Sequence, residues 1–434
     1  MKSFRPDEHR DPPGVVKGME SPTREASILR PMGAFERALY WHNKNNPAHF
    51  LLVAEVQEDI GVDELRGALA AVQARHPLLS AAVEVRAGLG PTFVRPQRVG
   101  EIPLRVADDG RTWAEIADSE LVDRIDTRSA PQVRATLLRS TGTAPAAVML
   151  TLDHAIADGR SAVVLMRDLF AALNGAQLPT LPLPESLETH LAGKGLVASE
   201  GPAALDASDE RMFTSAKKDP FGSSPYEITS LTLGEDLTGK LLSRARTEGT
   251  TVHAALLSAI STVLWRSGNF EYPRVYYPID VREPLGVTAE SGLYLIGARA
   301  AFDVDEVTGL WEMARHLTPA IRRARSTSNL AATSAMLRQV VGVDFAADTA
   351  EAVLSGPSGF EATCSNLGVV DLGVSDVARV RPTAVFGPVM GSEAGTALNL
   401  SVATFRGRMR LVNVTSRPLP GYLTSVRDTL AAAI

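Results

Sequence analysis

An apolar strand followed at once by an amphipathic helix is the feature that most constrains the fold of this chain. Residues 147–152 read AVMLTL, a run typical of a buried strand, and residues 161–175 read SAVVLMRDLFAALNG. Val163 and Met166 fall on one face of the predicted helix, and Gly175 stands where a helix commonly ends. A strand covered by the helix that follows it predicts an α/β protein.

The second half of the chain repeats this alternation. Residues 250–268 predict an amphipathic helix, residues 274–283 a strand that runs into a polar turn, and residues 397–416 two strands joined by a tight turn. The proline-rich stretch over residues 176–225 has few periodic apolar positions, which is typical of a linker. A length of 434 residues suits two domains. We therefore expect a polar N-terminal arm over 1–25, a first subdomain over 26–178, a linker or crossover over 179–225 and a second subdomain over 226–434.

Composition excludes several classes of protein. Hydrophobic residues make up 45% of the chain and charged residues 22%, which suits a globular protein with a substantial core. The net charge of −6 argues against a nucleic-acid-binding protein. The single cysteine, Cys364, excludes a disulfide framework and a multi-cysteine metal site, and we expect no metal. Neither a signal peptide nor an apolar run of about 18 residues is found, so we expect a soluble cytoplasmic protein without a membrane span.

His154 stands between the predicted strand and the predicted helix, in the segment HAIADG. Loops at strand ends commonly carry catalytic groups, and a histidine can act as a general base near neutral pH. A lone histidine at a strand end is nevertheless more often a hydrogen-bonded structural residue. The hexapeptide by itself therefore favours a structural role over a catalytic one.

Three further segments change that balance. ARHPLL lies at 74–79, YYPIDVRE at 276–283 and CSNLGVVD at 364–371, in order with HAIADG at 154–159. Together they resemble the chloramphenicol acetyltransferase-like superfamily, which includes nonribosomal peptide condensation domains. The closest likeness is to phthiocerol dimycocerosyl transferase-like, polyketide-associated acyltransferases. The resemblance implies two chloramphenicol acetyltransferase-like subdomains, each a mixed sheet with flanking helices, and an active-site tunnel between them.

The resemblance also implies roles for individual residues. His154 would be the catalytic base, and Asp158 would brace the loop by pairing with Arg282 of the second half. Gly159 could adopt a positive φ or allow close approach of the backbone. The alternative for the Asp158–Arg282 pair is a surface ion pair of about 0–1 kcal/mol.

The CSNLG segment offers candidates for the donor that an oxyanion needs. Ser365 and Asn366 could serve there or line the tunnel, and a purely structural role as a polar cap at a strand end is equally open. Cys364 is expected to be a buried strand residue rather than a nucleophile, since no local base accompanies it. The basic cluster at 320–326, with Arg315 and Arg338 nearby, could dock an acidic carrier protein, although a solvated helix face is the favoured interpretation.

The implied reaction is transfer of an acyl group from a thioester to an alcohol, which forms an ester of a polyketide-like or lipid product. The donor would be an acyl carrier protein or acyl-coenzyme A, because both present the same phosphopantetheine arm, and no cofactor would be bound. Two alternatives stay open: amide formation with an amine acceptor, and a catalytically silent relative that binds a carrier protein. Condensation domains usually carry two successive histidines, whereas this chain has Asp153 before His154. That departure and the standalone chain favour the ester, and we expect a monomer.

Overall fold

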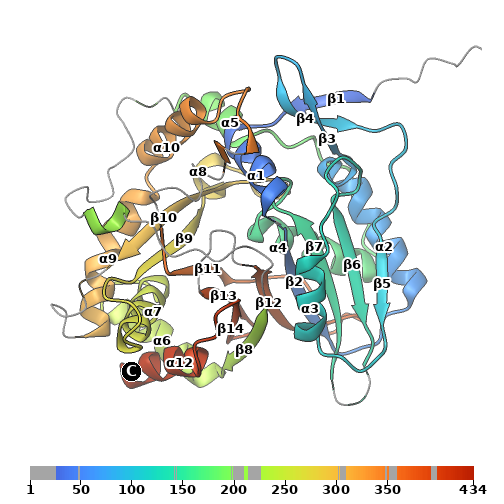
Figure 1. Ribbon diagram of the computed structural model, residues 1–434. Helices are drawn as coiled ribbons and strands as arrows, with labels where there is room; N and C mark the ends of the chain where they lie inside the picture. The colour runs from blue at the N-terminus through green and yellow to red at the C-terminus, as the bar shows by residue number, and fades with distance from the viewer. Residues whose placement is uncertain are drawn as a thin grey trace, which may run out of the picture.

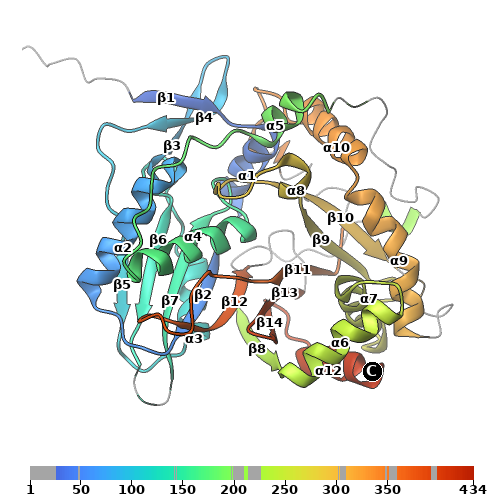
Figure 2. The same cartoon turned by 180° about the vertical axis from the view of Figure 1, so that it is seen from behind.

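The structure is a computed structural model with two α/β halves that lie side by side (Figures 1 and 2). The predicted α/β class, with a mixed sheet and flanking helices in each half, is confirmed. The predicted arm over 1–25 lies outside the described residues, as does most of the predicted linker. The structure describes residues 26–434 apart from 47–48, 141, 143, 197, 199–209, 214–225, 302, 304–308, 348, 351–358 and 392–397.

The first half is built on a five-stranded mixed sheet with helices on both faces. Its strand order is β12-β2-β7-β6-β5, with β5 parallel to β6 and the other pairs antiparallel. Helices α2 and α4 cover one face and α3 covers the other. The bounds are β2 His49–Val56, α2 Val62–Arg75, β5 Leu104–Ala107, α3 Trp113–Val122, β6 Val133–Leu138, β7 Ala146–Asp153, α4 Gly159–Leu173 and β12 Pro382–Met390.

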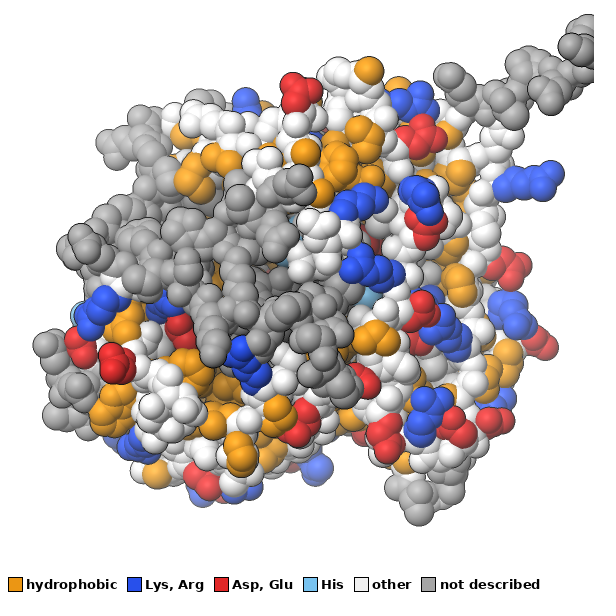
Figure 3. Space-filling view, in the orientation of Figure 1, with side chains coloured by type: hydrophobic (Ala, Val, Ile, Leu, Met, Phe, Trp, Pro, Cys, Tyr) orange, Lys and Arg blue, Asp and Glu red, His pale blue; other side chains and the backbone are white. Residues whose placement is uncertain are grey.

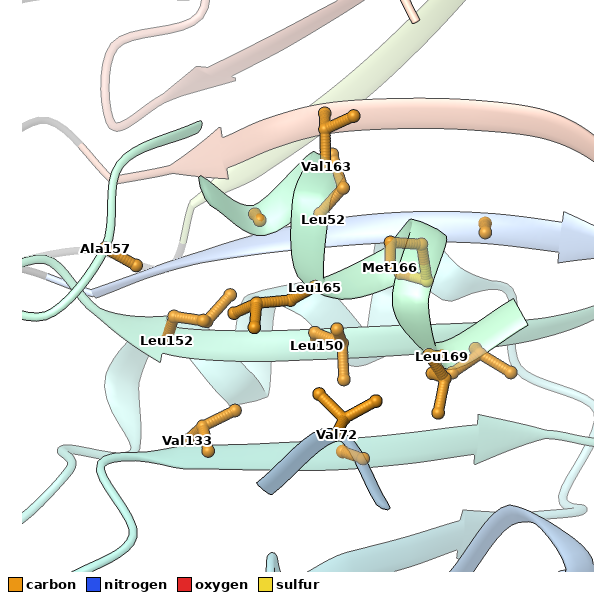
Figure 4. Packing of buried hydrophobic residues seen from close by; sticks show 14 of the residues in the cluster. Leu52, Val72, Val133, Leu150, Leu152, Ala157, Val163, Leu165, Met166 and Leu169 are labelled. Carbon is orange, nitrogen blue, oxygen red and sulfur yellow. The ribbon is translucent and has the colours of Figure 1, made fainter. Parts of the chain in front are cut away.

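Strand β7 is buried over its whole length, and its side chains alternate between the two helical layers. Leu150 and Leu152 belong to the core beneath α2 and α4, whereas Met149 packs with the residues of α3. Figure 4 shows the first layer, in which side chains of α4 and α2 meet those of β7 and β6. This packing fixes the end of β7, from which His154 projects.

The second half is built on a six-stranded mixed sheet of order β10-β9-β11-β13-β14-β8. Helices α6, α7, α9 and α12 pack with this sheet in a separate apolar core. The last two strands of the chain form the predicted hairpin, in which Arg406 and Gly407 adopt φ values of 49° and 72°. The bounds are β8 Glu227–Leu233, α6 Glu235–Thr247, α7 Val252–Arg266, β9 Arg274–Asp280, β10 Leu295–Ala301, α9 Leu310–Ala324, β11 Ala362–Val369, β13 Leu398–Phe405, β14 Arg408–Thr415 and α12 Tyr422–Ala432.

The remaining elements surround these two sheets. A three-stranded sheet of order β1-β4-β3 stands beside the first half. Two short helices lie between the larger elements: α5 follows α4 in the chain, and α8 follows β9. The bounds are β1 Ser27–Pro31, α1 Ala34–Asn45, η1 Pro77–Ser80, β3 Ala82–Arg86, β4 Gly90–Arg95, α5 Leu187–Gly193, η2 Glu210–Phe213, α8 Arg282–Leu285 and α10 Thr327–Val340.

Strand β12 departs from the predicted subdomain boundaries. It belongs by sequence to the segment expected to form the second subdomain, yet it pairs with β2 at the edge of the first sheet, with Val385 opposite Ala54. Its Phe386 and Val389 share a buried cluster with Val412 of β14. Val385 on its other face belongs to the core of the first half, so the strand is buried on both faces and contacts both halves.

Charge is evenly spread over the visible part of the first half. Figure 3 shows Lys and Arg side chains interleaved with Asp and Glu there, so this face carries no large region of one sign. Within the described ranges, every helix is too short or too polar to cross a lipid bilayer.

Candidate active site

His154 stands in the short turn between β7 and α4. Helix α4 begins directly after Asp158, whose side chain accepts a hydrogen bond of 2.8 Å from Ser161 N and so caps the helix. The His154 side chain is half-buried, and its ring centroid lies 5.0 Å from that of Phe50 on the adjacent strand. Its Nδ1 is buried and has no hydrogen-bond partner among the described residues.

The predicted contact between Asp158 and Arg282 is present and buried. Arg282 Nη1 donates to Asp158 Oδ2 at 2.9 Å, and Nη2 donates to Oδ1 at 2.8 Å. The two residues are 2% and 7% exposed, so the surface ion pair weighed as an alternative is wrong. Burial alone would raise the pKa of the Asp158 carboxyl, but the guanidinium and the hydrogen bonds hold that pKa below its ordinary value.

Further hydrogen bonds extend this ion pair into a joint between the halves. Arg282 Nη2 also donates to Ser161 Oγ at 2.7 Å, and Ser161 Oγ donates to the Gly292 carbonyl at 2.6 Å. Tyr294 N donates to Asp158 Oδ2 at 2.8 Å. The first turn of α4 is therefore tied to a segment of the second half through side chains and backbone alike.

Gly159 stands where the turn touches the second half. A Cβ atom at this position would lie 3.0 Å from Leu367 Cδ2 and 3.3 Å from Pro388 Cγ. Next to it, Arg160 Nη1 donates to the Leu367 carbonyl at 2.8 Å. Close approach of another segment thus explains the glycine, as expected, and the CSNLG segment meets the HAIADG segment here.

Ser365 and Asn366 differ in their surroundings. Ser365 is 8% exposed on β11 and lies opposite Ser401 of β13, whose Oγ is buried without a hydrogen-bond partner among the described residues. Asn366 Oδ1 accepts a hydrogen bond of 2.8 Å from Gly368 N, which favours the structural interpretation for Asn366. In the part of the chain that the structure describes, no hydrogen bond joins either residue to His154. An oxyanion role stays a prediction for both.

Two residues of the ARHPLL segment support helix α4, a role that could not be assigned from the sequence. Arg75 Nε and His76 Nε2 both contact Asp168 Oδ2 of α4, at 2.6 and 2.8 Å. His76 Nδ1 also lies 3.3 Å from Ser291 Oγ of the second half. The Arg-His-Pro sequence is the feature that could have indicated this role, since its arginine and histidine both contact the helix that follows the candidate base.

Asp153 is a second residue that sequence reasoning left without a role. It is the last residue of β7 and is 0% exposed. Its carboxylate accepts hydrogen bonds from Ala155 N at 2.9 Å and from Asn43 Nδ2 at 2.5 Å. A buried carboxylate adjacent to the candidate base could not have been inferred from the sequence, which places Asn43 about a hundred residues away.

Other candidate chemistry has less support. Cys364 is fully buried, and burial raises the pKa of its thiol to about 12, which is unsuited to a nucleophile. Arg315 of the basic cluster pairs with Glu248, as in a solvated helix face. Among the described residues, no group of three or more His, Cys, Asp or Glu side chains is arranged to hold a metal ion.

Comparison with known proteins places the fold. No protein-family model matches the chain. Polyketide synthase associated protein 5 from Mycobacterium tuberculosis superimposes with a TM-score of 0.66 at 19% identity, over 94% of this chain and 98% of that one. The first condensation domain of the CDA synthetase gives a TM-score of 0.68 at 16% identity, over 94% and 98%. The chain has the condensation-domain fold. The fold that the resemblance of the four sequence segments implied is thereby confirmed.

Curated relatives are matched only over part of their length. Cyclosporin synthetase simA of Tolypocladium inflatum is 25% identical over 242 residues, which are 51% of this chain and 2% of that protein. Nonribosomal peptide synthetase agiA of Aspergillus flavus is 32% identical over 141 residues, 30% of this chain and 2% of that protein. The chain thus corresponds to a small part of each synthetase. A tunnel between the halves of this condensation-domain fold stays a prediction.

Proposed function

We propose that this protein is an acyltransferase that moves an acyl group from a phosphopantetheine thioester to an alcohol, with His154 as the general base. One observation carries the proposal. In a condensation-domain fold, a half-buried imidazole stands at the β7–α4 turn, and the buried Asp158–Arg282 pair ties that turn to the second half. Such bracing suits a base that must keep its geometry while two substrates meet.

The reaction needs no covalent acyl-enzyme. His154 Nε2 takes the proton of the acceptor hydroxyl while the acceptor oxygen attacks the thioester carbonyl, because Nδ1 is buried. The tetrahedral intermediate then collapses, the carbon–sulfur bond breaks, and the departing thiolate takes the proton from the imidazolium. The products are an ester and a free thiol, and the base is restored. Ser365 would donate a hydrogen bond to the oxyanion.

Amide formation is the second candidate function. The curated relatives are peptide synthetases by name, which supports an amine acceptor. The same base would take a proton from an attacking amine. Asp153 in place of the first of two histidines supports the ester instead. A catalytically silent carrier-binding role is less well supported because His154 is retained.

An acceptor competition separates these candidates. Acyl-coenzyme A and an acyl-loaded carrier protein are each offered with equal concentrations of 1-octanol and octylamine, and products are read by intact-mass and small-molecule mass spectrometry. The ester as the main product supports the proposal, and the amide alone contradicts it. Binding of the loaded carrier without any turnover, over a panel of acyl chains, would support the silent relative. Comparison of the two donors shows whether a carrier or coenzyme A is used.

A further inference from the structure

Asp153 is a fully buried carboxylate directly before the candidate base. Its two oxygens are held by different parts of the first half: Ala155 N belongs to the turn that carries His154, and Asn43 Nδ2 belongs to α1. The backbone donor is two residues along the chain, so the carboxylate closes the turn upon itself. Removing a carboxylate from water is costly, and such a group is uncommon unless it has a partner or a role.

Burial and hydrogen bonding act in opposite directions on the charge of Asp153. Burial raises the pKa of its carboxyl to about 6, while the Ala155 N–H bond and the charge of His154 act in the opposite direction. The ionisable groups that face it are His154 in the turn, Lys44 on α1 and His49 across the strand pair. Burial lowers the pKa of His49 to about 4, so His49 is uncharged at pH 7. Within this turn, the positive charge that can interact with the Asp153 carboxylate is therefore that of protonated His154.

We propose that Asp153 is a positioning residue for His154, which anchors the turn through Ala155 N–H and stabilises the imidazolium that forms when His154 takes a proton. The inference rests on the proposed function. Between the interior of the sheet and the half-buried ring, a fixed negative charge acts with little screening by water. Its effect is therefore largest in the transition state, where the ring gains positive charge.

Two variants distinguish an electrostatic effect of Asp153 on His154 from a purely structural role in the turn. Asp153→Asn removes the charge and keeps an oxygen that can accept from Ala155 N. Asn43→Ala keeps the charge but removes one of its donors, which makes Asp153 easier to protonate. A supporting role alone would lower the rate in both variants without moving the pH profile.

The experiment records kcat/KM against pH for the wild type and both variants. For Asp153→Asn we expect the plateau to fall about tenfold and the midpoint of the acid limb to move to lower pH, because the base loses the charge that favours its protonated form. For Asn43→Ala we expect the midpoint to move in the same direction by a smaller amount, because a carboxylate that loses a donor is neutralised at higher pH and then favours the protonated base less. Midpoints that stay at the wild-type value in both variants would overturn the inference. If Asp153→Asn does not fold, the direction of the Asn43→Ala shift decides.

A readout without turnover keeps this test independent of the proposed function. The His154 ring signal is titrated by NMR in histidine-labelled protein, assigned by its loss in His154→Ala. A lower titration midpoint in Asp153→Asn supports the coupling, and an unchanged midpoint contradicts it. Full transfer activity in His154→Ala would instead refute the proposed function, and the NMR titration would then decide the coupling alone.

Discussion

Asp158 and Arg282 stand 124 positions apart in the sequence, yet the carboxylate accepts from both terminal nitrogens of the guanidinium at 2.8 and 2.9 Å. Asp158 also caps α4 through Ser161 N. One side chain thus begins the helix that follows His154 and joins that helix to the second half. Both partners are buried, so the contact differs in kind from the many exposed ion pairs of this protein.

Breaking this pair should destabilise the fold. Asp158→Asn and Arg282→Ala each leave a buried group without its charged partner, which costs about 3–5 kcal/mol of unfolding free energy. Urea denaturation measures the loss. The matched control is Asp63→Asn, which breaks the exposed Asp63–Arg66 pair of 2.7 Å and should cost less than about 1 kcal/mol.

The same variants separate structure from chemistry at Asp158. If Asp158→Asn keeps wild-type stability and loses all activity, the aspartate takes part in the reaction and its bracing role is wrong. A loss of stability comparable to that of Arg282→Ala is the expected result.

Gly159→Ala should destabilise the protein by about 1–3 kcal/mol, because the added methyl group meets Leu367 Cδ2 at 3.0 Å and Pro388 Cγ at 3.3 Å. Gly67→Ala is the control, since a Cβ at that helical position meets nothing within 4 Å. That control should be more stable than the wild type by about 0.5–1 kcal/mol. Thermal or urea unfolding of the two variants gives the comparison, and equal effects would refute the close contact.

Ser365 and Asn366 should differ in their variants. Ser365→Ala removes the candidate oxyanion donor and should lower kcat about 10²–10³-fold, with little change in stability. Asn366→Ala removes the acceptor of the 2.8 Å bond from Gly368 N and should cost about 1 kcal/mol of stability. Unaltered kcat in Ser365→Ala would leave that serine a structural residue.

The elements that surround the site were accessible to sequence reasoning because their patterns are local. The apolar run of β7 and the periodicity of α4 fixed the strand and the helix, and the intervening turn follows from both. Contacts between residues that are distant in the sequence cannot be predicted from such local patterns. The Asp158–Arg282 contact came from a family resemblance, since nothing in either local segment specifies the other.

Two features could not be predicted for a physical reason. The apolar pattern of β12 indicates a strand but not its sheet, because a strand buried on both faces fits either half. Burial of Asp153 depends on α1 and on the sheet around it, and a charged residue at a strand end is ordinarily expected in water.

That burial has a pH-dependent consequence for stability. A carboxyl whose pKa rises from 3.8 to about 6 on folding binds its proton more tightly in the folded state, so the contribution of Asp153 to stability falls as pH rises from about 4 through 6. The asparagine of Asp153→Asn does not titrate, so its contribution to stability does not change with pH over this range. Relative to the wild type, the variant should therefore gain about 2 kcal/mol between pH 4 and pH 7.5. Urea unfolding at both pH values measures the gain, and a constant difference would contradict the buried charge.

The most direct test of the account is acyl transfer to an alcohol by His154→Ala beside the wild type, with the folded state of both verified by circular dichroism and the ester quantified by mass spectrometry. A general base contributes about 10²–10⁴-fold to the rate, so we expect the variant to lose at least about a hundredfold of kcat while it remains folded. Ester formation by folded His154→Ala at the wild-type rate would contradict the central claim that this histidine is the base.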